Sequence, residues 1–178
     1  MELHRRLNSV KPWPQVAIFP EGTTTNGKAL ITFKSGGFKP GVPVQPVLIK
    51  YSPMFDSLSW TIGGPPMLTL LWLCLCQVSI PLKITFLPVY YPNEEEKQNP
   101  ILYAENVRKV MSEKSSLPCT GHSYEDFRLC LKAEKLNLPW HVGNIEFFKT
   151  CYKRGIKLWD AEKKLEEFST ILTTRKTV

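Results

Sequence analysis

Four short apolar runs in the first half of the chain predict strands. Glycine and proline clusters, which favour turns, separate the runs. The runs cover residues 16–19, 42–50, 58–62 and 83–90. Strands of this kind, followed later in the chain by helical patterns, predict an α/β fold class in which helices cover a mixed sheet.

Helical periodicity replaces the strand pattern after the polar stretch 92–99. Asn99 followed by Pro100 predicts an N-cap with proline at the first helical position. One apolar stripe follows at helical spacing, formed by Tyr103, Val107, Val110 and Met111. We expect this helix to cover the sheet. The resulting organisation is an α/β domain at 1–114 and a small helical region at 115–178.

The second region is predicted to consist of short helices. Ser123 with Asp126 resembles a capping box, and Asn144 is a candidate N-cap for a helix at 145–154. Apolar residues then recur at helical spacing: Leu158, Ala161, Leu165, Phe168 and Leu172. These positions favour packing over chemistry.

The longest apolar run, 66–82, is too short to predict a membrane span. A spanning helix needs about 20 consecutive apolar residues, and Gln77, Ser79 and Pro81 interrupt this run. Two interpretations stay open, a buried core helix and a segment that dips into one leaflet. We expect any true anchor upstream, outside this chain.

The composition of the chain restricts the classes of partner that it is expected to bind. The chain has 178 residues, 43% of them hydrophobic, with a net charge of +7 and a pI near 9.2. This charge favours anionic surfaces, either lipid headgroups or phosphorylated substrates. Basic residues are scattered and lack the aromatic platform that binds single strands, which argues against nucleic acid.

Five cysteines, an odd number without metal-binding spacing, predict free thiols in a reducing compartment. We expect Cys74 and Cys76 to be small buried hydrophobic residues, with palmitoylation as the alternative.

A polar turn directly behind the run 16–19 is the main candidate site. Ligands bind at the carboxyl ends of strands in open α/β sheets. The candidate substrate-binding residues of this turn and the lysine downstream are Glu21, Gly22, Thr23, Thr24, Asn26 and Lys34. Glu21 could either fix the turn by accepting backbone N–H bonds or hold an acceptor hydroxyl.

A second candidate block stands about twenty residues further along. Its members are Val42, Pro43, Val44 and Pro46. Proline cannot donate to a ladder, so the block is either a stiff wall of a substrate site or an edge strand with a bulge.

The pairing of Phe-Pro-Glu-Gly-Thr at 19–23 with Val-Pro-Val-x-Pro at 42–46 resembles the third and fourth sequence blocks of the glycerolipid acyltransferases. The stretches 29–34, 87–90 and 93–97, with the segment around Trp60, are similar to the lysophosphatidylcholine acyltransferase branch. The resemblance runs from about residue 11 to 168. It implies a partial glycerolipid acyltransferase fold whose helical tail leads toward EF-hands. No calcium-binding loop is expected here, because no Asp-x-Asp-x-Asp-Gly sequence occurs.

The resemblance implies an enzyme that transfers an acyl group from acyl-CoA to a lysophospholipid at the membrane of the endoplasmic reticulum or Golgi, with no bound cofactor or metal. The Val42–Pro46 block would line the acyl or acceptor tunnel, and Lys34 would contact phosphate or CoA. Phosphate-handling members often carry arginine where this chain has Thr24, which favours a phosphocholine-type acceptor.

The family's catalytic His-x-x-x-x-Asp block is not found in the sequence. Ser9 stands five residues after His4, Asp126 follows His122 by four, and Glu146 follows His141 on the wrong side of the Glu-Gly-Thr block. We therefore expect a chain that carries the substrate-binding half of an acyltransferase, with the base upstream. The alternative is a non-catalytic truncated product that binds lipid or acyl-CoA, or pairs with a full-length protein.

Overall fold

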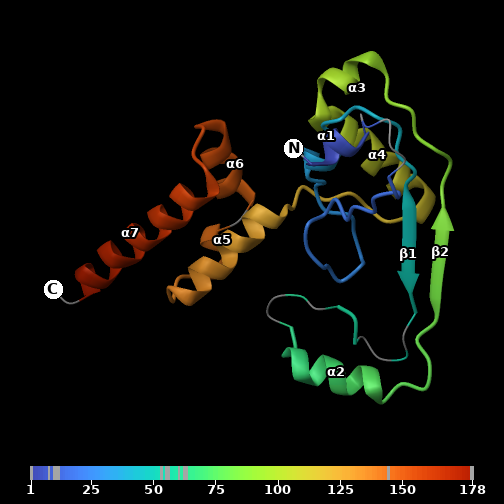
Figure 1. Ribbon diagram of the computed structural model, residues 1–178. Helices are drawn as coiled ribbons and strands as arrows, with labels where there is room; N and C mark the ends of the chain where they lie inside the picture. The colour runs from blue at the N-terminus through green and yellow to red at the C-terminus, as the bar shows by residue number, and fades with distance from the viewer. Residues whose placement is uncertain are drawn as a thin grey trace. The chain divides into compact units, whose positions relative to one another are not determined.

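The computed structural model divides the chain into two compact units (Figure 1). The described residues are 2–7, 9, 13–52, 54, 57–59, 61, 64–143 and 145–176. The units are Met1–Thr120 and Gly121–Val178. The domain boundary expected from the sequence was residue 114, a few residues before the first unit ends.

Helices and one antiparallel pair of strands make up the first unit. Its elements are α1 (Glu2–Leu7), the short 3-10 helix η1 (Ser35–Gly37), β1 (Val47–Tyr51), α2 (Met67–Leu75), β2 (Leu82–Phe86), α3 (Glu94–Gln98) and α4 (Pro100–Ser115). In the pair, Val47 lies opposite Phe86 and Tyr51 opposite Leu82. Helices and strands therefore coexist as expected, but within the described residues the sheet has only two strands.

The strand expected at 16–19 is wrong. The segment has no regular structure, and the side chain of Phe19 is 77% exposed. Pro14 and Pro20 bracket the run, and neither can donate to a strand ladder. The polar turn that follows is consequently not at the end of a sheet strand.

The other expected strands are shortened or absent. The range 42–50 forms β1 with an isolated bridge at Val44, and 83–90 forms β2 with the matching bridge at Tyr90. The range 58–62 contains no strand in its described residues.

A cluster of buried side chains around Tyr103, the Tyr103 core, organises the first unit. Its members are Phe33, Phe38, Tyr103, Ala104 and Val107, with Val44, Tyr90 and Met111 packed against it. α4 supplies most of the cluster, and its main contacts are with η1 and α3. The expectation that this helix covers the sheet holds only at the Val44–Tyr90 bridge, whose residues pack against the Tyr103 core, because Phe33 and Phe38 fill the rest of its apolar stripe. The strands carry exposed apolar side chains instead.

The predicted N-cap of α4 is confirmed. The side chain of Asn99 accepts hydrogen bonds from the backbone N–H groups of Ile101 and Leu102, both at 3.2 Å. The polar stretch before it, expected to be only a boundary, contains α3. There Asn93 and Glu96 form a capping box that the sequence reading missed.

α2 is not the buried core helix that the sequence suggested. Leu70 is buried, whereas most of its other apolar side chains are exposed. Cys74 is half-buried and Cys76 exposed, so the expectation that both are buried is wrong. All five cysteines are free thiols, as predicted. No helix within the described ranges combines the length and apolarity needed to cross a bilayer.

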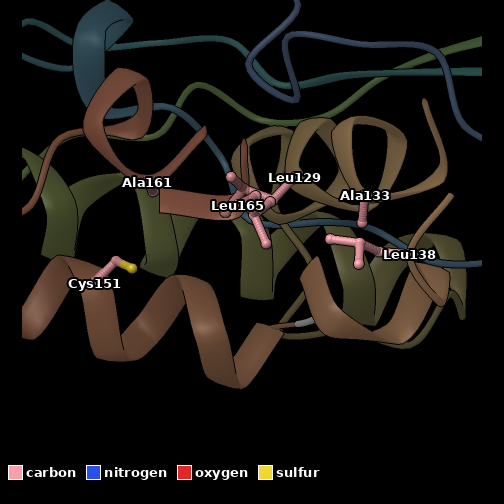
Figure 2. Close-up of a cluster of buried hydrophobic side chains, with 6 residues drawn as sticks. All are labelled: Leu129, Ala133, Leu138, Cys151, Ala161 and Leu165. Atoms are coloured by element: carbon pink, nitrogen blue, oxygen red, sulfur yellow. The ribbon is translucent and has the colours of Figure 1, made fainter. Parts of the chain in front are cut away.

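The second unit is helical around its own core. Its elements are α5 (Tyr124–Lys135), the 3-10 helix η2 (Trp140–Gly143), α6 (Ile145–Lys153) and α7 (Leu158–Lys176). Figure 2 shows the six buried side chains that these elements bring together: Leu129, Ala133, Leu138, Cys151, Ala161 and Leu165. The predicted capping box of Ser123 and Asp126 is confirmed. The cap expected at Asn144 lies outside the described residues.

Candidate substrate-binding site

Glu21 lies in a tight turn and closes the loop that follows it. The backbone N–H of Gly22 donates to the carbonyl of Phe19 at 3.2 Å. Oε1 of Glu21 accepts a hydrogen bond of 3.1 Å from the backbone N–H of Ile31. Of the two roles proposed for this carboxylate, the geometry supports the first, in which it fixes the turn.

The electrostatic environment of Glu21 is mixed. Burial raises the pKa of its carboxyl above the ordinary value of 4.5, while the hydrogen bond from Ile31 and the charge of Arg108 oppose the rise. A half-buried carboxylate of this kind is held in place and partly desolvated.

Gly22 is required by its backbone and by its neighbour. Its φ of +72° lies in the left-handed region, and a Cβ placed there would be 2.7 Å from Cε and 3.4 Å from Nζ of Lys34. The backbone N–H of Lys34 donates to the carbonyl of Pro20 at 2.7 Å. The structure thus brings Lys34 to the Glu21-Gly22 turn, with its ammonium group against the glycine.

The hydroxyl and amide side chains behind the glycine shape the loop. Thr25 Oγ1 accepts from the N–H of Gly27 at 3.3 Å, and Asn26 Oδ1 accepts from the N–H of Lys28 at 3.1 Å. Thr23 Oγ1 donates to the carbonyl of Thr24 at 3.5 Å. Thr24 itself is exposed at the surface of the loop.

Arg108 of α4 supports the far end of this loop, and the sequence reading missed it. Its guanidinium is buried, donating through Nη1 to the carbonyl of Thr120 at 2.7 Å and through Nη2 to Glu105 at 2.8 Å. The 118–120 segment in turn pairs with Leu30, beside the Ile31 amide that Glu21 holds. A signal was present, because Arg108 is one helical turn after Ala104 on the buried face.

The second block is fixed to the Tyr103 core. The hydroxyl of Tyr103 donates to the carbonyl of Val42 at 2.8 Å, and Val44 exchanges backbone hydrogen bonds of 3.1 and 2.8 Å with Tyr90. The carbonyl of Pro46 accepts from the N–H of Leu87 at 3.0 Å. These hydrogen bonds fix the backbone of the second block at Val42, Val44 and Pro46.

The register of this pairing also contains an irregularity. Val44 bridges Tyr90 and Val47 bridges Phe86, so the 86–90 side has one residue more than the 44–47 side. The bulge that was predicted for the second block therefore lies on the segment opposite it, although the block itself is an edge strand of a two-stranded pair. Phe33, next to Lys34, and Val44 pack in the same Tyr103 core, so the core connects the two blocks.

The histidine-acid pair of the second unit serves a helix cap. Nδ1 of His122 lies 3.0 Å from Oδ2 of Asp126, but the other carboxylate oxygen of Asp126 accepts from both the N–H and the hydroxyl of Ser123. This carboxylate is consequently committed to the start of α5. In the part of the chain that the structure describes, no group of three or more His, Cys, Asp or Glu side chains could hold a metal ion.

Comparison with known proteins identifies the family. Lysophosphatidylcholine acyltransferase 2 of Danio rerio is 48% identical over 171 residues, which are 96% of this chain and 32% of the relative. Lysophosphatidylcholine acyltransferase 1 of Rattus norvegicus is 48% identical over 168 residues, 94% of this chain and 32% of the relative. Lysophosphatidylcholine acyltransferase 2 of Homo sapiens is 45% identical over 177 residues, 98% of this chain and 32% of the relative.

By name these relatives are acyltransferases, and the matched lengths are great enough to include both candidate blocks. The chain belongs to the lysophosphatidylcholine acyltransferase family. It spans about a third of the length of the curated relatives it matches, 32% in each case. No protein-family model matches the chain, and no solved structure matches it.

Proposed function

We propose that this chain carries the substrate-binding blocks of an acyl-CoA-dependent lysophospholipid acyltransferase that acts in phospholipid biosynthesis and remodelling. The observation that carries the proposal is the 48% identity to a lysophosphatidylcholine acyltransferase over 96% of the chain. The acceptor would be lysophosphatidylcholine or its ether-linked counterpart, and the donor a long-chain acyl-CoA or acetyl-CoA. The site of action would be the cytoplasm-facing membrane of the endoplasmic reticulum or Golgi.

The reaction joins the glycerol hydroxyl of the acceptor to the acyl carbonyl of the thioester. The new ester C–O bond forms as the C–S bond breaks, and the hydroxyl proton passes through a base to the departing CoA thiolate. The chain's own residues would bind and orient the two substrates, because the His-x-x-x-x-Asp block that provides the base in this family does not occur in the sequence.

Lys34 is the residue proposed to contact substrate phosphate. Its ammonium is held at the Glu21-Gly22 turn, where the glycine leaves room for it. A lysine acts as a point charge toward phosphate, and the phosphates of acyl-CoA and of the lysolipid headgroup are both suitable partners. Thr24 at the exposed end of the turn leaves space for a headgroup that carries its own cation.

The rigid wall at Val42–Pro46 would guide the acyl chain. Ordering a flexible acyl chain costs entropy, and a wall that is already fixed adds no further ordering cost on binding. The hydrogen bonds from Tyr103 to Val42 and between Val44 and Tyr90 provide this rigidity.

The test is an acyl-transfer assay on two forms of the protein. One is the chain as it stands, and the other is the chain extended at its amino terminus by the His-x-x-x-x-Asp region of a relative. Each is assayed with oleoyl-CoA or acetyl-CoA and a panel of lysophosphatidylcholine, lyso-ether-phosphocholine and lysophosphatidic acid, beside its Glu21→Ala variant.

We expect turnover in the extended form only, preference for phosphocholine acceptors, and loss of turnover in Glu21→Ala. Turnover by the chain as it stands, clearly above its Glu21→Ala control, would contradict the assignment of the base to residues outside it. No turnover in either form, with retained lipid or acyl-CoA binding, would support the second candidate function, a non-catalytic binding protein. The absence of the base motif is the observation that favours that candidate.

A further inference from the structure

α2 is an apolar helix that the rest of the first unit leaves uncovered. Its side chains Leu68, Trp72 and Leu75 are 79%, 67% and 72% exposed. Only Leu70, at 5%, is buried. A helix that is apolar all round is normally surrounded by protein or by lipid.

The sequence around α2 is almost free of charge. Between residues 51 and 82 the only charged residue is Asp56. In Figure 1, α2 lies beyond the ends of β1 and β2 that are far from α4. The strand pair thus carries this apolar helix away from the Tyr103 core.

The segment between β1 and β2, which contains α2, is called the lobe below. Gln77, the polar residue that interrupts the apolar run, holds this lobe together. Its Nε2 donates to the hydroxyl of Ser57 at 2.6 Å and to the carbonyl of Leu73 at 3.2 Å. Its Oε1 accepts from the N–H of Met54 at 3.0 Å. The amide therefore ties the preceding loop to the helix and does not interrupt its apolar face.

Two lysines are placed at the base of the lobe. Lys50 and Lys83 are directly opposite each other in the strand pair, one position from the Tyr51–Leu82 pair at the α2 end. Both are exposed. Like charges directly opposite each other on a sheet repel, and a nearby anion relieves the repulsion. The lobe thus combines an apolar tip with a site that attracts negative charge.

These features match the interface of a phospholipid bilayer. A nine-residue helix is about 14 Å long, which is too short to cross a hydrocarbon core of about 30 Å. A short helix that is apolar all round gains free energy when its exposed side chains move from water to the acyl-chain boundary of one leaflet. Trp72 is of the type enriched at this depth, and lysines beside it pair with anionic headgroups.

We propose that α2 docks in the interface of a bilayer that contains anionic lipid, with Lys50 and Lys83 at the level of the headgroup phosphates. Docking does not depend on acyl transfer, so its test involves no turnover. It also fits the proposed function, because a lysophospholipid acceptor would be presented at the same surface.

The first experiment measures sedimentation of the chain with vesicles of phosphatidylcholine, with and without phosphatidylserine. Leu68→Glu with Leu75→Glu should weaken binding by at least about tenfold, because the proposal places both leucines among the acyl chains, where a charge is unfavourable. Lys50→Gln and Lys83→Gln should each weaken binding about fivefold on phosphatidylserine vesicles and leave binding to phosphatidylcholine unchanged. The matched control is the double variant Ile101→Glu with Ile171→Glu, at two exposed apolar residues outside α2. This variant should bind vesicles as well as the unmodified chain does.

The second experiment locates the helix by tryptophan quenching with brominated acyl chains. Trp72→Phe should remove the quenched signal, whereas Trp159→Phe, a similarly exposed tryptophan of the second unit, should retain it. Circular dichroism confirms that each variant is folded. Quenching that survives Trp72→Phe would overturn the proposal. Vesicle binding that is unchanged in the Leu68→Glu, Leu75→Glu variant would also overturn it. A chain that does not bind vesicles but self-associates, and that these two substitutions convert to a monomer, would overturn it as well.

Discussion

The Glu21 carboxylate and the backbone N–H of Ile31 are joined by a hydrogen bond of 3.1 Å that spans ten positions of the chain. Through this contact the glutamate side chain holds the two ends of the 21–31 loop together. Lys34 lies against the same turn, so the loop and the cation near it depend on one side chain. Substitutions at Glu21 should therefore change both stability and substrate binding, and they can be chosen to separate the two.

Glu21→Gln should be at least as stable as the unmodified chain at neutral pH. Burial raises the pKa of Glu21, so the folded state favours its protonated form and stability is lost as pH rises through that pKa. Glutamine keeps the acceptor for Ile31 without the charge. Glu21→Ala should be less stable than Glu21→Gln by about 1 kcal/mol, the worth of the hydrogen bond.

Urea unfolding at pH 7 and at a pH below 4.5 measures the effect at Glu21. The advantage of Glu21→Gln should shrink in acid, where the native carboxyl is protonated. A Glu21→Gln variant clearly less stable than the unmodified chain at pH 7 would contradict this account.

Gly22→Ala should destabilise the first unit by about 1–2 kcal/mol, because an L side chain at a φ of +72° is strained. The new methyl group would also displace the Lys34 side chain, so phosphate or acyl-CoA binding should weaken more than stability does. The matched control is Gly36→Ala, where a Cβ meets nothing within 4 Å. Thermal unfolding together with acyl-CoA titration checks both effects, and equal behaviour of the two variants would count against the turn.

Glu96→Ala should cost about 2–4 kcal/mol, because it leaves several buried partners without an acceptor. Its carboxylate accepts from the hydroxyl of Tyr90 at 2.6 Å, the amide of Asn106 at 2.6 Å and the N–H of Asn93 at 2.8 Å. Burial alone would raise the pKa of Glu96, but these hydrogen bonds outweigh it and lower the pKa.

A lowered pKa means that the stabilisation by Glu96 is present above the ordinary value of 4.5 and is lost as pH falls through the folded pKa. Denaturant unfolding from pH 7 into acid should therefore show a steeper loss in the unmodified chain than in Glu96→Ala. The exposed Glu95→Ala is the control and should change neither quantity. Parallel acid profiles for all three proteins would refute the prediction.

Tyr103 should ionise only at high pH, and its ionisation should destabilise the first unit. Burial is the main cause that raises the pKa of Tyr103 to about 12, and the same holds for Tyr90. Their neutral forms are favoured by the fold, so this stability is complete below pH 10 and is lost as pH rises toward 12.

An alkaline absorbance titration of phenolate measures the transition. Tyr103→Phe should remove a late-titrating group and cost about 1–2 kcal/mol, because the carbonyl of Val42 loses its donor. Tyr91→Phe, at an exposed tyrosine, is the control and should leave both the late transition and the stability unchanged. A late transition whose amplitude is unchanged in Tyr103→Phe would exclude a buried Tyr103 in solution.

The sequence by itself determined the local features and the family. The cap at Asn99, the capping box of Ser123 and Asp126, and the free thiols depend on neighbouring residues or on simple counting, and the structure confirms them. The pairing of the 19–23 block with the 42–46 block indicated the family for the same reason, since each block is a short continuous segment.

Tertiary structure alone decided which apolar segments are covered. The run at 16–19 and the helix α2 have the composition of buried elements, yet Phe19 and Leu68 are exposed. Arg108, a charged residue, is buried, because the carbonyl of Thr120 and the carboxylate of Glu105 meet its guanidinium. The hydrophobic pattern of the sequence indicates whether a side chain favours water or an apolar environment. Whether that side chain is buried depends on partners that come from distant parts of the chain.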